Sequence, residues 1–194
     1  MADMLPRGAL PRGRPPTRRP VLLATLRRVR TDKVFLVGFM AAGKSTVARA
    51  LGARIDWRVE DVDARIESRE RSTVADIFAT RGETYFRATE RAVLRELLPL
   101  RHTVVATGGG TFADPGNRRI INADGASVWL DVSFQTVVDR IPPDGRRPLA
   151  SDRTSMEALY SSRRASYRHA HLRLDADRAP AGELVERILE WLGE

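Results

Sequence analysis

Residues 38–45 read Gly38-Phe39-Met40-Ala41-Ala42-Gly43-Lys44-Ser45, and this stretch decides the fold class. It satisfies every position of the pattern G-x-x-x-x-G-K-[ST], a glycine-rich loop whose backbone N–H groups surround phosphates. An apolar run over residues 34–37 precedes it, and a helical pattern follows from Thr46. A strand, a glycine loop and a helix in this order bring phosphates to a helix N-terminus. We therefore interpret the stretch as a site for a nucleoside triphosphate.

Two side chains of this loop suit phosphate and metal chemistry. Lys44 can reach β- and γ-phosphate oxygens, and the hydroxyl of Ser45 can bind Mg²⁺. Of the 33 basic residues in the chain, only Lys33 and Lys44 are lysines. A compact ammonium fits between phosphate oxygens where a planar guanidinium does not, so a lysine at this position supports the interpretation.

Length and composition limit the possible classes of protein. A chain of 194 residues with 42% hydrophobic content can form one α/β domain with a full core. It has no cysteine, which excludes disulfides and thiolate chemistry and fits a reducing cytoplasm. No apolar run approaches the ~20 residues of a membrane span. We therefore expect a cytoplasmic protein without a membrane partner.

The net charge of +8 is concentrated at the N-terminus. Of the 33 basic and 25 acidic residues, eight arginines and Asp3 fall in residues 1–31, which leaves 25 basic and 24 acidic residues for the rest. The Pro, Gly and Arg content of this segment argues against a packed core. We expect residues 1–31 to be a disordered basic extension and residues 32–194 to be the domain. An organelle presequence or a weak polyanion-binding arm are the alternatives; no specific nucleic-acid partner is expected.

Beyond the extension, strand-like and helix-like patterns alternate, which predicts a three-layer α/β/α domain with a mainly parallel five-stranded sheet. The second strand is the weakest of the five, because Glu60 occupies a position where an apolar residue is usual. Ligands of such sheets collect at the carboxyl ends of the strands. The strands are expected at 34–37, 57–60, 103–106, 127–130 and 172–174, and the helices at 46–51, 74–81, 86–98, 134–140, 156–169 and 181–192.

Two polar or glycine-rich clusters follow predicted strands. After the second comes Asp61-Val62-Asp63, whose carboxylates would point the same way in an extended segment and could serve a metal and a hydroxyl. After the third comes Thr107-Gly108-Gly109-Gly110, where backbone and ligand can approach closely. Taken alone, the first cluster is more typical of a surface turn, and the second of a flexible turn.

A third cluster lies between these two, in residues 82–90. There Arg87 and Glu90 are spaced i, i+3 on one helix face, so the glutamate can orient the guanidinium for bidentate binding of a carboxylate. Most pairs with this spacing are surface ion pairs, and this alternative stays open.

Taken in order, these elements resemble the shikimate kinase family. The resemblance covers roughly Lys33 to the C-terminus, and the triple glycine together with F-R-x-x-E distinguishes this family from other small P-loop kinases. The matching segments are 38–46, Asp61-Val62-Asp63-Ala64-Arg65-Ile66-Glu67, Ala75-Asp76-Ile77-Phe78, 82–90, 107–110, Arg147-Pro148-Leu149 and Arg163-Arg164-Ala165-Ser166-Tyr167.

The resemblance implies ATP as the co-substrate, Mg²⁺ as the metal, and phosphorylation of the 3-hydroxyl of shikimate in aromatic amino-acid biosynthesis. It assigns Mg²⁺ to Ser45 and, through water, to Asp61. Arg147 belongs to a short mobile lid and would neutralise the transferred phosphoryl group, and Arg140 would stack on adenine. The nucleotide site comprises Gly38, Ala41, Ala42, Gly43, Lys44, Ser45, Thr46, Arg140 and Arg147.

The resemblance also implies how shikimate is held. Asp63 would bind ring hydroxyls and orient or deprotonate the accepting one, so Lys44, Asp63 and Arg147 are the expected catalytic residues. Arg87 and Arg163 would bind the substrate carboxylate. The shikimate site comprises Asp63, Phe78, Phe86, Arg87, Gly108, Gly109, Gly110 and Arg163.

Some positions depart from the family pattern. Ala41 replaces a common Gly or Ser, Ala150 interrupts the usual R-P-L-L, and the segment between Arg147 and Arg163 is a few residues short. The alternatives are therefore a kinase of the same fold acting on gluconate, a nucleoside monophosphate or a shikimate analogue, or a non-catalytic homologue. We expect a monomer.

Overall fold

The structure, a computed structural model, describes residues 31–141 and 152–193. Residues 1–30 of the basic extension, and Arg147 of the expected lid, lie outside the described residues. Within the described ranges the chain forms five strands and seven helices. In chain order they are β1 (Lys33–Val37), α1 (Lys44–Ile55), β2 (Arg58–Asp61), α2 (Val62–Glu70), α3 (Val74–Leu97), β3 (Thr103–Ala106), α4 (Pro115–Asp124), β4 (Ala126–Asp131), α5 (Phe134–Arg140), α6 (Arg153–Tyr167), β5 (Leu172–Asp175) and α7 (Ala181–Leu192).

The five strands form one sheet in the order β2-β3-β1-β4-β5, and every neighbouring pair is parallel. The α/β prediction is thus confirmed, with a sheet that is parallel throughout. β1 is the central strand, with β3 on one side and β4 on the other. The loop that follows β1 therefore lies in the middle of the carboxyl edge, where parallel strands direct their ligands.

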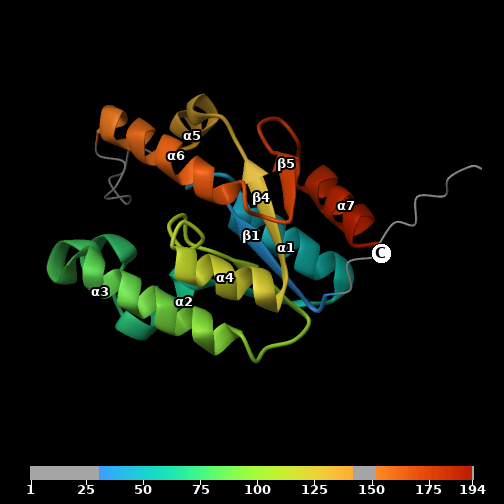
Figure 1. Cartoon of the computed structure of the whole chain (residues 1–194), viewed down its shortest axis with the longest axis horizontal. Helices are drawn as coiled ribbons and strands as arrows, with labels where there is room; N and C mark the ends of the chain where they lie inside the picture. The colour runs from blue at the N-terminus through green and yellow to red at the C-terminus, as the bar shows by residue number, and fades with distance from the viewer. Residues whose placement is uncertain (1–30, 142–151, 194) are drawn as a thin grey trace, which may run out of the picture.

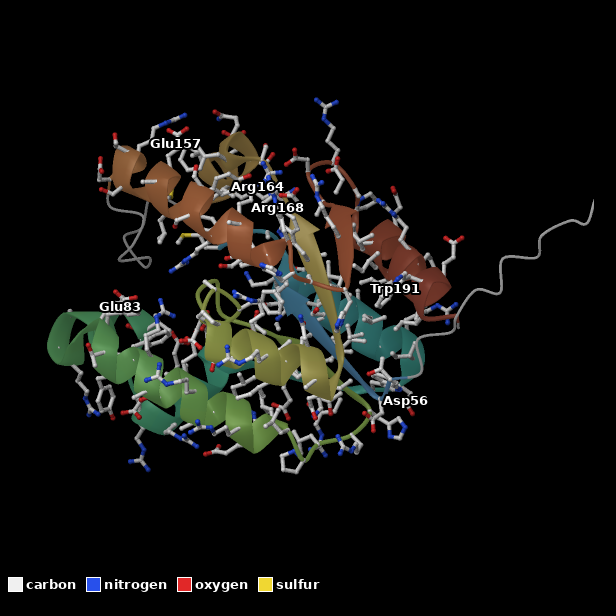
Figure 2. All side chains as sticks on the ribbon, viewed as in Figure 1. Asp56, Glu83, Glu157, Arg164, Arg168 and Trp191 are labelled. Atoms are coloured by element: carbon white, nitrogen blue, oxygen red, sulfur yellow. The ribbon has the colours of Figure 1, made fainter. Side chains whose placement is uncertain are left out.

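Helices cover the sheet on both faces. In Figure 1, α1 and α7 lie together on one side of the strands, and α3 and α4 lie on the other. Helices α3 and α6 extend in the same direction beyond the sheet as two separate arms. Glu83 and Glu157 mark these two arms in Figure 2.

The core is built around β1. Its residues 34–37 are fully buried, because a strand of a parallel sheet with helices on both faces has no solvent side. Burial of each such side chain stabilises the fold by about 1.5–3 kcal/mol. β4 is buried along its whole length as well. The phosphate loop thus follows directly on a fully buried strand.

The element boundaries correct several expectations. β2 spans residues 58–61 in place of 57–60, and Glu60 is accommodated by an ion pair with Arg65 (2.7 Å). Helices α2 and α4 were not predicted, although Asp114 and Pro115 are ordinary start signals for α4: the Asp114 side chain accepts the N–H of Asn117 at 2.8 Å. α2 was missed because Asp61-Val62-Asp63 was interpreted as extended throughout.

The two helices predicted at 74–81 and 86–98 are one element, α3, with a break inside it. Gly82 has φ 77° and ψ 169°, a conformation that glycine adopts at no steric cost. The expected division into two helices is therefore present as a kink at Gly82 within one helix. It separates residues 83–90 from the first two turns of α3.

Candidate active site

The phosphate loop joins β1 to α1 through residues with positive φ. Gly38 (φ 141°) admits no side chain, because a Cβ there would lie 2.7 Å from the carbonyl oxygen of Leu130. Gly43 (φ 92°) directly precedes the first helical residue, Lys44. Ala41 has φ 60°, which costs a non-glycine residue about 1–2 kcal/mol. The departure noted at Ala41 is therefore a position of backbone strain within the loop.

Lys44 and Ser45 stand at the N-terminus of α1, as the motif predicts. The Lys44 ammonium donates to the carbonyl oxygen of Phe39 at 2.7 Å, across its own loop. The Ser45 hydroxyl donates to Asp61 Oδ2 at 2.5 Å. Strands β1 and β2 are separated by β3, so it is the tertiary fold that brings Ser45 to Asp61.

The aspartates at the end of β2 do not share an extended segment, as the sequence interpretation assumed. Asp61 is the N-cap of α2: its Oδ1 accepts the N–H groups of Asp63 (3.0 Å) and Ala64 (3.2 Å). Asp63 is already in the first helical turn. Both carboxylates nevertheless reach the same cavity, because the tight cap turns the chain there.

That cavity has a volume of about 580 Å³ and lies at the carboxyl edge of the sheet. Arg140 reaches across it and donates to the carbonyl oxygens of Ala41 (3.5 Å) and Asp177 (2.9 Å). The lining residues are Met40, Ala41, Ala42, Gly43, Lys44, Ser45, Thr46, Val47, Asp61, Asp63, Thr107, Gly109, Arg140, Ala176, Ala179, Ala181 and Leu184. The described nucleotide and metal residues line this cavity except Gly38, and two predicted substrate residues, Asp63 and Gly109, line it with them. The other predicted substrate residues do not line it: Phe78, Phe86, Arg87, Gly108, Gly110 and Arg163.

The triple glycine packs closely against side chains from other elements. A Cβ at Gly108 would lie 2.7 Å from Asp63 Oδ1 and 2.9 Å from Glu90 Oε1. A Cβ at Gly110 would collide with the guanidinium of Arg87. A side chain at Gly108 or Gly110 would therefore displace Asp63, Glu90 or Arg87, which supports close approach as the reason for these two glycines.

Arg87 is held by its own helix. Its Nη1 donates to Glu90 Oε2 at 3.0 Å, and Nε and Nη2 donate to Glu83 Oε1 at 3.2 and 3.1 Å. Phe86 and Phe78 lie against its guanidinium, with ring centroids 5.1 and 5.9 Å away. Burial alone would lower the pKa of Arg87, but these carboxylates outweigh it and the pKa is raised. The expectation that Glu90 orients Arg87 is confirmed.

Arg163 is buried on α6 and faces the same glycines. Its Nη1 would lie 3.3 Å from a Cβ at Gly109, and its guanidinium lies 5.7 Å from the ring centroid of Phe39. Burial lowers the pKa of Arg163 from its ordinary value. The guanidinium nevertheless stays charged, because arginine is not deprotonated in proteins. Two arginines from separate helices, Arg87 and Arg163, thus approach Gly110 and Gly109 respectively.

Some residues of the site were missed by the sequence analysis. Ala176 and Ala179 line the cavity from the β5–α7 connection, and Ala181 and Leu184 line it from the start of α7. Their location after a predicted strand was the only signal in the sequence that could have indicated a binding site. Their apolar side chains carry no group that indicates a ligand. Tyr167 was quoted only as part of a motif, yet its hydroxyl donates to the Gly109 carbonyl oxygen at 2.5 Å.

The donor set at the loop is suited to Mg²⁺. Ser45 and Asp61 offer a hydroxyl and a carboxylate at hydrogen-bond distance, and Mg²⁺ typically takes one or two such protein ligands together with water and substrate phosphates. In the part of the chain that the structure describes, no cluster of three or more acidic, His or Cys side chains forms an all-protein metal cage. In the same part, no helix is both long and apolar enough to cross a bilayer.

A phosphate loop on the central strand of a parallel sheet, with a charged cavity beside it, defines the class of P-loop kinases. The family model described as shikimate kinase matches residues 40–193. The chain belongs to the shikimate kinase family.

Individual relatives agree with this membership. The chain is 39% identical over 157 residues to a shikimate kinase of Sulfurihydrogenibium sp., covering 80% of this chain and 95% of the relative. It is 36% identical to that of Persephonella marina, covering 80% and 96%. A shikimate kinase from Acinetobacter baumannii, solved in complex with shikimate, superposes with a TM-score of 0.79 at 32% identity, covering 82% of this chain and 92% of that one.

Proposed function

We propose that the chain transfers the γ-phosphoryl group of ATP to the 3-hydroxyl of shikimate. The observation that carries the proposal is the pair of arginines, Arg87 and Arg163, packed against the triple glycine beside the phosphate loop. Two guanidinium groups that approach adjacent glycines suit a carboxylate, which gluconate and shikimate carry and nucleosides lack. The aromatic rings of Phe78 and Phe86 beside Arg87 favour a ring substrate over an open-chain sugar acid.

Phosphoryl transfer depends mostly on positioning and charge stabilisation, and the proposed roles follow from that requirement. Lys44 and the N–H groups of residues 38–46 bind the nucleotide phosphates, and Arg140 contacts the adenine. Ser45 and Asp61 hold Mg²⁺, which when bound neutralises phosphate charge. Asp63 accepts the proton of the 3-hydroxyl, whose oxygen bonds to the γ-phosphorus while the bond to the β–γ bridging oxygen breaks and ADP leaves.

The remaining parts of the proposal concern the whole chain. Arg147 stabilises charge on the transferred group from a lid, as the family resemblance implies, and lies outside the described residues. Residues 32–194 are the catalytic domain, and residues 1–31 are dispensable for it. The protein acts as a monomer in the cytoplasm.

A coupled assay with ATP, Mg²⁺ and a panel of shikimate, an aminated analogue and gluconate tests the function. We expect shikimate to give the highest kcat/KM, and Lys44→Ala to abolish detectable turnover with an unchanged melting temperature. Arg49→Ala is the matched control, because Arg49 is an exposed residue of the same helix, and it should keep full activity. Full activity of Lys44→Ala, or a preference for gluconate, would contradict the proposal.

A further inference from the structure

The hydroxyl of Tyr167 bridges two parts of the site that the chain separates by more than fifty residues. Tyr167 lies one helical turn after Arg163 on α6, on the same face. Its Oη donates to the Gly109 carbonyl oxygen at 2.5 Å, and Arg163 Nη1 lies beside the same glycine, 3.3 Å from where a Cβ would stand. The Tyr167 side chain is 2% exposed, so its hydrogen bond does not compete with bulk water.

The chemistry of this hydroxyl fits a fixed contact. The phenol O–H donates, and the Gly109 carbonyl oxygen accepts. Burial raises the pKa of Tyr167, and the charge of Arg163 opposes that rise only in part. The phenol therefore stays protonated throughout the pH range of an assay. Trp129, with its ring centroid 5.9 Å away, limits movement of the ring.

Gly109 is a sensitive position for such a contact. A Cβ there would lie 3.3 Å from Arg163 Nη1 and 3.4 Å from the backbone nitrogen of Met40 in the phosphate loop. Gly109 thus sits between an arginine of the carboxylate end and the loop of the phosphate end. A hydroxyl that holds its carbonyl fixes the spacing between the two.

We propose that Tyr167 is a positioning residue for substrate specificity, which aligns the Arg163 guanidinium and the Gly109 backbone for the substrate carboxylate. This inference rests on the proposed function, because it needs a carboxylated substrate beside Arg163 and Gly109. Tyr167 does not touch the reacting atoms; it acts through Arg163 and Gly109. Without the hydroxyl, Arg163 keeps its charge, but the Gly109 backbone beside its guanidinium loses the hydrogen bond that fixes its position.

Tyr167→Phe removes the hydroxyl and keeps the ring. We expect the KM for shikimate to rise about tenfold, with the KM for ATP and kcat within about threefold of the unmodified protein, because ground-state and transition-state binding of the carboxylate are weakened alike. The matched control is Tyr160→Phe. Tyr160 is a buried tyrosine of the same helix whose hydroxyl donates to the Val132 carbonyl oxygen at 2.7 Å, away from the glycines.

Both variants lose one buried hydroxyl bond, so a purely structural role would make them equivalent in melting temperature and in kinetics. Equal shikimate KM values for Tyr167→Phe and Tyr160→Phe would overturn the inference. The methyl ester of shikimate gives a second readout. Since the ester has no carboxylate, its KM should be the same in the Tyr167→Phe variant and the unmodified protein, and a tenfold difference there would also overturn the inference.

Dependence on Arg163 is tested by a double-mutant cycle. If Tyr167 acts through Arg163, Tyr167→Phe combined with Arg163→Lys should raise the shikimate KM little more than Arg163→Lys alone. Additive effects would show that the hydroxyl acts independently and would overturn the inference. Failure of the proposed function is a different result: the unmodified protein would not phosphorylate shikimate at all.

Discussion

At the scale of single residues, neighbouring side chains hold the Arg87 guanidinium in one orientation. Two carboxylates of α3, Glu83 and Glu90, fix its guanidinium, and the Glu90 side chain is only 1% exposed. Thr111 in turn donates to Glu90 Oε1 at 2.7 Å. A buried carboxylate with both oxygens engaged cannot move without breaking hydrogen bonds, so it holds the arginine in one orientation.

We expect Arg87→Lys to raise the KM for shikimate about tenfold or more, equivalent to ~1.4 kcal/mol or above. Lysine keeps the charge but loses the planar fork that matches a carboxylate. The KM for ATP should stay within error, as measured by steady-state kinetics with each substrate varied. Arg81→Lys is the control, because Arg81 is exposed, precedes the Gly82 break and pairs with Glu70. A rise in the KM for ATP in the Arg87→Lys variant would assign Arg87 to the nucleotide pocket instead.

At the scale of elements, Lys33 connects the C-terminal ends of α3 and α4 to the central strand β1 by hydrogen bonds. It is fully buried at the start of β1, and its Nζ donates to the carbonyl oxygens of Leu97 (3.0 Å) and Leu98 (2.7 Å) and to Asp124 Oδ2 (2.6 Å). One ammonium thus satisfies carbonyls left open at the end of α3 and a carboxylate at the end of α4. These contacts lie at the amino edge of the sheet, opposite the site.

Lys33→Met should lower the free energy of unfolding by about 3 kcal/mol, the low end for breaking a buried pair, because Asp124 is 19% exposed and keeps Arg101 at 3.7 Å. Urea denaturation measures the change. Kinetic constants at a temperature well below the transition should be unaltered. Arg54→Met is the control: Arg54 and Glu186 are both more than half exposed, and their loss should cost under about 1 kcal/mol. Equal losses of unfolding free energy in the two variants would refute the inference that the buried Lys33 contacts stabilise the fold.

At the scale of the whole molecule, charge and catalysis belong to different parts of the chain. Every site residue inferred here lies after residue 31, where 25 basic residues face 24 acidic ones. The net positive charge lies almost entirely in residues 1–31. A nearly neutral body has little capacity for the counterion release that drives binding to polyanions.

A chain that begins at Thr31 should therefore keep kcat and both KM values within about twofold of the full-length protein. The same truncation should abolish salt-sensitive retention on a heparin column, which full-length protein run in parallel should show. Loss of activity or poor folding after truncation would mean that Val21-Leu22-Leu23 and their neighbours pack on the domain.

The sequence by itself determined the features that consecutive residues encode. The phosphate loop needs only glycines, a lysine and a serine in one turn after a buried strand, and the strand–helix alternation needs only local periodicity. Helix α7 has the bounds that its pattern predicts. The pairing of Arg87 with Glu90 was also accessible, because i, i+3 spacing is a property of one helix.

Only the tertiary structure decided which distant residues meet. The strand order places β3 between β1 and β2, and it is this order that brings Asp61 to Ser45 and the triple glycine between α3 and α6. Asp61 became a helix cap, and Asp63 a first-turn residue, through the junction of β2 and α2. The contact of Tyr167 with Gly109 has no local signal, because it depends on how two helices and a sheet edge pack together.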